Sequence, residues 1–332
     1  MQSHASETVT RHPSEKPGLR VPTIQMRFAA IWIAFVVLVL IGAVFLPRSI
    51  QPSALQSVLP FAAFLAIASM GQSLVIMVRG IDLSVPAIVT LSSTLLLGIS
   101  RGADEMMAAG VIIGLLGAAG VGMVNGILVA VFRLNALIVT MAVGSVVAGL
   151  TLWYRQGLPA EASVPQSLSK FGSQTYLGIN TSVWIALILT CVITIVLRRT
   201  LIGRQFETVG SNPDAAHATG VRSASYQAGA FVAAAVLYGI VGIILSAFIR
   251  NPTLEVGQPY LLAPIAAAVL AATSINGGIG SMIAVLGGAL FLTHLGQMLK
   301  LIGLETSYQM IIQGVAIAVG MFLSSFFEGR KR

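Results

Sequence analysis

Ten stretches of this sequence are each long enough to cross a lipid bilayer and carry almost no charge. A charged side chain at the centre of a membrane helix costs about 3 kcal/mol, whereas about 20 apolar residues cross readily. The sequence therefore predicts an all-α membrane protein with about ten transmembrane helices. We place them at residues 28–46, 54–78, 84–100, 106–132, 135–154, 181–198, 225–249, 260–276, 281–299 and 306–327. Only Arg198, at the end of the sixth range, is charged.

The charge balance supports the same fold. Charged residues make up 9% of the chain, against about 25% in a typical soluble domain. A net charge of +8 suggests binding to nucleic acid, but basic residues in a membrane protein usually mark its cytoplasmic side. With the N-terminus inside, thirteen of the 19 basic residues fall on the cytoplasmic side. We therefore expect both termini in the cytoplasm and the lipid bilayer, not nucleic acid, as a partner.

The chain divides into three parts. Residues 1–26 form a polar cytoplasmic tail, residues 27–328 the transmembrane domain, and residues 329–332 a short basic cytoplasmic end. A long inside loop at 199–224 separates the first six spans from the last four, and a long outside loop covers 155–180. Because helices 2–5 and 7–10 start on opposite sides, the order of spans is compatible with an inverted repeat.

The sequence lacks the patterns of most catalytic sites. It has no G-x-x-x-x-G-K-[ST] loop for ATP, no His or Cys pair at metal-ligand spacing, and no nucleophile elbow. An intramembrane enzyme is therefore not expected. One acid, Asp82, lies at the edge of the third span. Either Asp82 or Ser84 caps the helix that follows, or Asp82 takes part in gating or translocation.

The inside loop contains a segment, residues 203–221, that predicts a short helix outside the membrane. Ser211 or Asn212 is its expected N-cap, Asp214 lies near the positive end of the helix dipole, and Gly220 is its expected stop. Such a helix is not needed to span a bilayer. It is either an ordinary surface helix or a docking element for a cytosolic partner.

This segment resembles a known transport element. Residues 214–220 read D-A-A-H-A-T-G, similar to the E-A-A-x-x-x-G coupling helix of ABC importer permeases. Four further stretches narrow the resemblance to ribose-type permeases: Gly80–Val85 (G-I-D-L-S-V), Asn135–Thr140 (N-A-L-I-V-T), Gly203-Arg204 with Gly210 and Asn212 (G-R…G-x-N), and Thr273-Ser274 with 277–281 (T-S…G-G-x-G-S). The similarity runs in order from about residue 55 to about residue 325.

The resemblance implies a membrane-spanning permease subunit of an ATP-driven importer, multi-pass in the bacterial inner membrane. It implies a second permease subunit, identical or different, a cytoplasmic ABC ATPase, and a periplasmic solute-binding protein. ATP and Mg would be bound by the ATPase, with no cofactor in this chain. A sugar or sugar-like solute would pass from periplasm to cytoplasm by alternating access. The implied ATPase-coupling residues are Gly203, Arg204, Gly210, Asn212, Asp214, Ala215, Ala216 and Gly220.

Uncharged polar side chains within or beside the spans are candidates for the translocation path or gate. With Asp82, they are Ser84, Asn125, Asn135, Thr140, Thr273, Ser274 and Asn276. Their commoner use is to satisfy the helix backbone or a neighbouring helix. Departures from the family pattern at Pro86 and residues 261–264 leave the solute open. The alternatives are another small polar solute, such as a nucleoside or signalling furanoside, and a facilitator that works without ATP.

Overall fold

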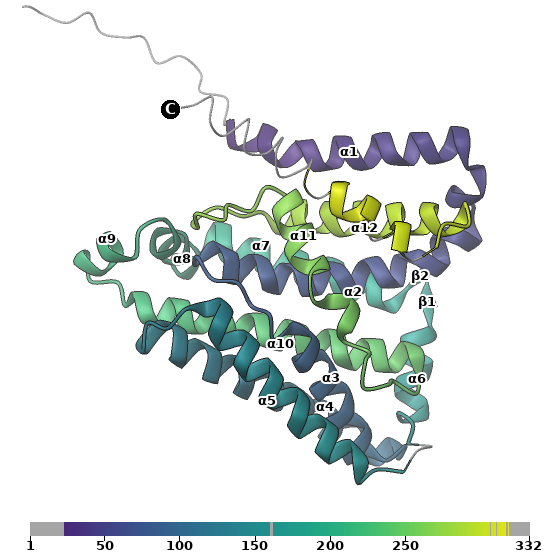
Figure 1. Ribbon diagram of the computed structural model, residues 1–332, viewed down its shortest axis with the longest axis horizontal. Coiled ribbons are helices and arrows are strands. Elements are labelled where there is room, and N and C mark those ends of the chain that lie inside the picture. Colours follow the sequence, from purple (N-terminus) through teal and green to yellow (C-terminus); the bar gives the residue numbers. More distant parts are fainter. Residues whose placement is uncertain (1–22, 160–161, 306, 310, 317, 319–332) are drawn as a thin grey trace, which may run out of the picture.

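The computed structural model of the protein describes residues 23–159, 162–305, 307–309, 311–316 and 318, and it is almost entirely helical. Figure 1 shows the long helices packed alongside one another. Helices α8 (Leu201–Ser211) and α9 (Pro213–Ala218) stand at one end of this bundle. Helix α6 (Gln166–Ser173) and an antiparallel hairpin of β1 (Thr175–Tyr176) and β2 (Ile179–Asn180) lie at the opposite end. The predicted all-α class is confirmed at this level.

Within the described residues, seven helical stretches are long and apolar enough to cross a membrane. They are α1 (Thr23–Phe45), α2 (Pro52–Met77), α4 (Met107–Gly126) with a short 3-10 helix, Asp104–Met106, before it and a π-helix, Ile127–Val131, after it, α5 (Ala136–Gln156), α7 (Thr181–Arg199), α10 (Ser223–Ile249) and α12 (Met282–Leu301). Two apolar helices are shorter: α3 (Val85–Ser100) and α11 (Ala263–Leu270), which follows the turn Gln258–Tyr260. Another short turn, Pro47–Ile50, joins α1 to α2.

Helix α2 is the centre of the molecule. Every side chain from Ala62 to Met77 is buried, and α10, α12, α11 and α7 pack around it. A helix on the outside of a membrane bundle leaves one apolar face to lipid. Helix α2 has no such face over these residues, so its polar side chains have to find partners among the surrounding helices.

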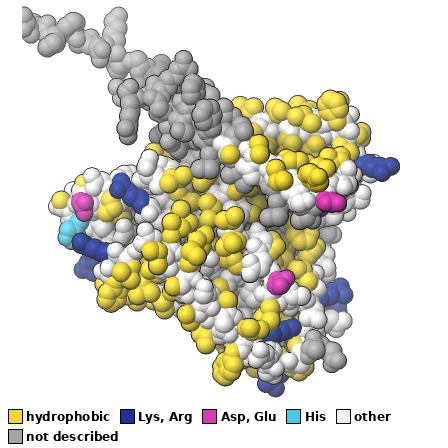
Figure 2. Space-filling view, in the orientation of Figure 1, with side chains coloured by type: hydrophobic (Ala, Val, Ile, Leu, Met, Phe, Trp, Pro, Cys, Tyr) yellow, Lys and Arg dark blue, Asp and Glu magenta, His cyan; other side chains and the backbone are white. Residues whose placement is uncertain are grey.

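The outer helices show the opposite pattern. Large apolar side chains such as Val44 on α1, Ile138 and Trp153 on α5, and Ile188 on α7 are exposed. Figure 2 shows apolar side chains spread over this face of the molecule, with charged side chains towards its ends. In water so much exposed apolar surface would drive aggregation, whereas in a bilayer it meets the lipid tails.

The predicted span at 260–276 is wrong as a continuous helix. Helix α11 ends at Leu270, where Thr273 N–H donates to the Ala268 carbonyl and Ala272 N–H to that of Val269. These two bonds form a Schellman motif, and Ala272 takes the left-handed position (φ 59°) that glycine usually occupies. The chain then continues without a helix to Ser281. Because the sequence has no glycine at the end of this helix, the prediction relied on apolar composition alone and placed the end of the span too far along the chain.

Two other predicted spans also need comment. Within the span at 84–100 the helix begins at Val85, and the seven residues before this helix, 78–84, are not helical although they are largely buried. The span at 306–327 falls mostly outside the described residues. Its described parts, 307–309, 311–316 and 318, are helical.

Close helix contacts depend on glycine, most clearly between α4 and α10. A Cβ atom on Gly122 would lie 2.6 Å from the carbonyl oxygen of Phe231, and one on Gly126 would lie 2.8 Å from Cα of Ala228. Both distances are too short for non-bonded atoms. The small residues therefore let the two backbones approach, which is the main source of helix association in lipid.

Gly122→Ala should destabilise the protein, whereas Gly120→Ala on the same helix should not. The Gly122 methyl group would overlap α10, which costs about 1–3 kcal/mol. A methyl group on Gly120 meets nothing within 4 Å, so only the gain in helix propensity of up to about 1 kcal/mol remains. Thermal unfolding of the two variants in the same detergent measures the difference. Equal melting temperatures would contradict the packing described here.

Candidate functional site

The α8–α9 loop, residues 199–224, projects from one end of the bundle and begins with a tight turn. Thr200 caps α8 by accepting a hydrogen bond from the Gly203 N–H at 3.2 Å. A Cβ atom on Gly203 would lie 2.1 Å from the Leu197 carbonyl oxygen, so the turn from α7 into α8 requires glycine there. Arg204, the next residue, is exposed.

Asn212 is the N-cap residue of α9, which begins at Pro213. The Asn212 side chain accepts hydrogen bonds from the N–H groups of Asp214 at 3.1 Å and Ala215 at 3.0 Å. Pro213 occupies the first helical position, where a missing N–H costs nothing. Of the two N-caps expected, the structure therefore selects Asn212. Ser211 instead ends α8, where its hydroxyl donates to the Glu207 carbonyl.

Helix α9 ends at the predicted glycine. Gly220 has φ 85°, its N–H donates to the His217 carbonyl, and the Val221 N–H donates to the Ala216 carbonyl. This is a second Schellman motif, and it satisfies carbonyls that the helix leaves free. The predicted stop at Gly220 is confirmed.

One side chain of α9 is buried against the rest of the protein, and its neighbours on the helix are exposed. Ala216 is fully buried against the rest of the protein, whereas Asp214, Ala215, His217 and Ala218 are exposed. Figure 2 shows charged side chains gathered at this end of the molecule. The loop thus presents a small exposed surface, anchored through Ala216, at the end of the bundle.

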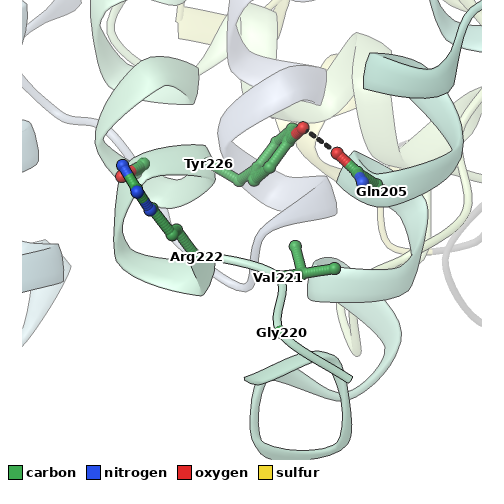
Figure 3. Close-up of a pocket in the computed structure, with 6 residues that line it drawn as sticks. Gln205, Gly220, Val221, Arg222 and Tyr226 are labelled. Atoms are coloured by element: carbon green, nitrogen blue, oxygen red, sulfur yellow. Dashed lines mark hydrogen bonds between the residues drawn. The ribbon is translucent and has the colours of Figure 1, made fainter. Parts of the chain in front are cut away.

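A cavity of about 410 Å³ opens beside α9. It lies between α8 and the start of α10, and Figure 3 shows the residues that line it. Tyr226 on α10 donates a hydrogen bond to the side-chain oxygen of Gln205 on α8, and Arg222 also lines the cavity. The cavity adjoins the end of α9, because Gly220 and Val221, which follow this helix, line it.

The loop is fixed to the core at a point we call the junction, formed by Met77, Arg79, Gly210, Ser211 and Gly278. The Arg79 guanidinium donates to the Gly210 carbonyl at 2.9 Å and to the Ser211 carbonyl. The Gly278 N–H donates to the Met77 carbonyl at 2.8 Å. The ends of α2 and α8 and the non-helical segment after α11 therefore meet at one place.

Glycine is required at the junction because three backbones converge there. A Cβ atom on Gly210 would lie 2.0 Å from the Met77 carbonyl oxygen and 2.7 Å from the Gly278 nitrogen. Gly278 itself has φ 80°, a conformation that costs most other residues about 1–2 kcal/mol.

Shortly after Arg79 in the chain, Asp82 and Ser84 form part of a buried polar cluster. The Asp82 Oδ1 atom accepts from the Ser84 N–H at 2.8 Å and from its hydroxyl at 2.5 Å. The Asn125 amide on α4 donates to Ser84 Oγ at 2.9 Å, and Thr140 Oγ1 on α5 accepts from the Leu83 N–H at 3.0 Å. Four predicted candidates, Asp82, Ser84, Asn125 and Thr140, are thus brought together and fully buried.

The expected capping role of Asp82 or Ser84 needs correction. Ser84 is the N-cap residue of α3, but no side chain caps that helix. The Asp82 carboxyl bonds instead to Ser84 itself, which shapes the turn before the helix. The cap prediction is therefore wrong in its geometry, although Asp82 does hold the chain at the point where α3 begins.

The other predicted path residues lie elsewhere. Asn135 is exposed and caps α5, accepting from the Leu137 N–H at 2.9 Å. Thr273 is buried against α2, where its hydroxyl contacts that of Ser73 at 3.0 Å. Ser274 is half-buried and Asn276 exposed, both in the segment after α11.

Sequence reasoning missed Gln72, Tyr238 and Arg79. The Gln72 side chain on α2, oriented to satisfy both its polar atoms, donates to the Asp82 carbonyl at 3.1 Å and accepts from the Asp82 N–H at 3.2 Å. It also contacts the Tyr238 hydroxyl on α10 at 3.0 Å. The only local signal was a glutamine within an apolar run.

Comparison with known proteins identifies the chain. A family model described as "Branched-chain amino acid transport system / permease component" matches residues 54–320. The chain belongs to this permease family. The ribose import permease RbsC of Bacillus subtilis is 31% identical over 289 residues, covering 86% of this chain and 89% of the relative. No solved structure matches.

Two further relatives carry different names. The L-arabinose ABC transporter permease AraH of Azospirillum brasilense is 27% identical, over 92% of this chain and 89% of that protein. The autoinducer 2 import permease LsrC of Photorhabdus laumondii is 31% identical, over 82% and 80%. The chain is accordingly a multi-pass membrane permease subunit of a bacterial ABC importer, the transport component and not the catalytic one.

Gly210→Ala should loosen the junction. Its methyl group would overlap the Met77 carbonyl, so α8 and the segment after α11 would have to move apart. Amide hydrogen exchange, followed by mass spectrometry, should rise in residues 201–211 and 271–281. Gly229→Ala is the control, because a methyl group there meets nothing within 4 Å. Unchanged exchange in the Gly210 variant would rule out the junction as a rigid contact.

Proposed function

We propose that this subunit moves a sugar or sugar-like solute from periplasm to cytoplasm by alternating access, driven by an ATPase that docks on the α8–α9 loop. The observation that carries the proposal is the exposed α9 helix, capped at both ends and tied through the junction to the buried helix α2. The names of the relatives support the solute class, since two of them are sugar permeases. ATP and Mg would be bound by the ATPase.

We further propose ten transmembrane helices with both termini in the cytoplasm, and an inverted repeat of helices 2–5 and 7–10. In this topology the loop at 199–224 is cytoplasmic and the loop at 155–180 periplasmic. The position of α8 and α9 at the end of the bundle opposite α6 supports it. So does the excess of basic residues assigned to the cytoplasmic side.

In this scheme ATP binding moves the α8–α9 loop, and Arg79 passes the movement to the core. Arg79 donates hydrogen bonds to the end of α8, and Asp82 lies only three residues further along the chain. The cluster of Asp82, Ser84, Asn125 and Thr140 would act as the gate, since it links the segment 78–84 to α4 and α5. A ligand can bias such a two-state device only by binding one state more tightly.

The remaining path candidates take lesser roles in this proposal. Thr273, Ser274 and Asn276 belong to the non-helical segment that the junction holds, and would move with it. Asn135 would serve only as the cap of α5. A path lined by uncharged polar groups suits a neutral polyhydroxylated solute, which it can pass through transient hydrogen bonds.

The complex we propose also contains a second permease subunit, identical or different, and a periplasmic binding protein that captures the solute. Capture outside the membrane leaves the permease free of tight binding, which would slow release. A second candidate solute class is a signalling furanoside, because one relative of 31% identity is an autoinducer 2 permease. Binding measurements on the secreted partner distinguish the two classes.

Ala215→Arg should abolish ATP-driven uptake and release the ATPase during purification. Ala215 is exposed, so the arginine leaves the fold intact but blocks the close approach of a partner. Gln174→Arg, exposed at the opposite end of the bundle, is the control and should leave ATPase binding unchanged. Uptake without ATP by vesicles containing the permease alone would instead select the facilitator.

Arg79→Gln should separate docking from transmission. The variant keeps α9 intact, so the ATPase should still co-purify. It loses the charged donor that holds both carbonyls at the end of α8, and such charge-assisted bonds are about twice as strong as neutral ones. Uptake should fall at least tenfold while ATP hydrolysis continues. Wild-type uptake in this variant would show that the movement reaches the core by another route.

A further inference from the structure

The Asp82 carboxyl group has an asymmetric set of contacts. The whole side chain is buried. Its Oδ1 atom accepts two hydrogen bonds, from the N–H and the hydroxyl of Ser84. Its Oδ2 atom is equally buried and accepts none within the described part of the chain. In an ionised carboxylate both oxygens carry charge, and both need donors when water is excluded.

No positive group compensates a charge at this position in the described structure. Arg79, three residues away, is turned towards the carbonyls of Gly210 and Ser211. The elements packed around Asp82 present uncharged groups: Gln72 from α2, Asn125 from α4 and, through Gln72, Tyr238 from α10. Tyr238 is the one titratable side chain among them, and it carries no positive charge. An unpaired buried carboxylate is among the most costly groups that a protein can hold.

The same cluster has a second acceptor without a donor. Asn125 uses its amide N–H to donate to Ser84, and its Oδ1 atom is buried without a partner. Asn125 therefore donates to Ser84, and Ser84 donates to Asp82. Two acceptor atoms, Asp82 Oδ2 and Asn125 Oδ1, are left without a donor in the described structure. A carboxylic acid matches the Asp82 contacts, because its carbonyl oxygen accepts while its hydroxyl oxygen carries a proton.

We propose that Asp82 holds a proton on Oδ2 in this conformation, so that the buried cluster is a proton-binding site at the centre of the permease. The carbonyl oxygen is then Oδ1, which Ser84 satisfies twice. The proton removes the negative charge that no group in the cluster compensates. This proposal concerns the chain alone and goes beyond the proposed transport function.

One consequence does rest on the proposed function. If the α8–α9 loop pulls on Arg79, the segment 78–84 moves and Asp82 meets water. The O–H bond of the acid then breaks, the proton passes to water, and the carboxylate remains. Because the conformation described here binds the proton more tightly than the opened one, lower pH stabilises it and higher pH favours opening.

Infrared spectroscopy of the purified full chain tests the protonation directly. At about pH 6 exposed carboxyl groups, whose ordinary pKa is about 4, are almost fully ionised. The wild type should nevertheless show the C=O band of a protonated carboxyl group, and Asp82→Asn should remove it. Glu207→Gln is the demanding control, because burial also raises the pKa of Glu207 while Arg198 lowers it. This control should leave the band in place.

A second variant covers the case in which Asp82→Asn does not fold. Ser84→Ala removes the hydroxyl donor from the acid's carbonyl oxygen, so the band should move to higher frequency. A wild type without the band, or a band that neither Asp82→Asn nor Ser84→Ala changes, overturns the proposal. The measurement needs no ATPase and no solute, so its outcome is independent of the proposed transport function.

Discussion

Lipid offers no hydrogen bonds, so every polar group inside the bundle has to find its partner within the protein. This constraint explains why the two non-helical segments of the core lie against α2. The segment 78–84 is held by Gln72 and Thr140, and the segment after α11 is held at Met77. Each break in a helix frees backbone groups, and each is placed where a buried side chain or carbonyl can satisfy them.

The junction joins the α8–α9 loop to the core through the backbone. A peripheral helix pair usually contacts a membrane core through side chains, which can slide. Here the contact is between backbones, through Gly210 and Gly278, and a guanidinium group bridges two carbonyls at the end of α8. Such a contact has little freedom to slip. In the mechanism we propose, these contacts would pass a displacement of the α8–α9 loop to the end of α2 and to the segment before α3.

Helix positions could be predicted from the sequence wherever charge or glycine marked them. The stop of α9 was predictable because Gly220 has a strong local preference, and its N-cap could be narrowed to Ser211 or Asn212 because both residue types favour that position. The end of α11 could not be predicted, because its left-handed position is occupied by Ala272 and not by glycine, the residue that would have indicated a helix stop. Of the site, the sequence singled out Asp82 and its polar neighbours. No local rule could reveal that Arg79 binds Gly210, 131 residues away, because that contact exists only in the folded chain.

The burial of α2 on all sides has a consequence for how the protein is made. Translation delivers α2 to the membrane long before α10, since Gln72 and Tyr238 are 166 residues apart. Until α10 arrives, the polar face around Gln72 and Ser73 borders on lipid or on the insertion machinery. Assembly of the core therefore cannot finish helix by helix in chain order. It has to wait for the second half of the polypeptide, which closes over a helix inserted early.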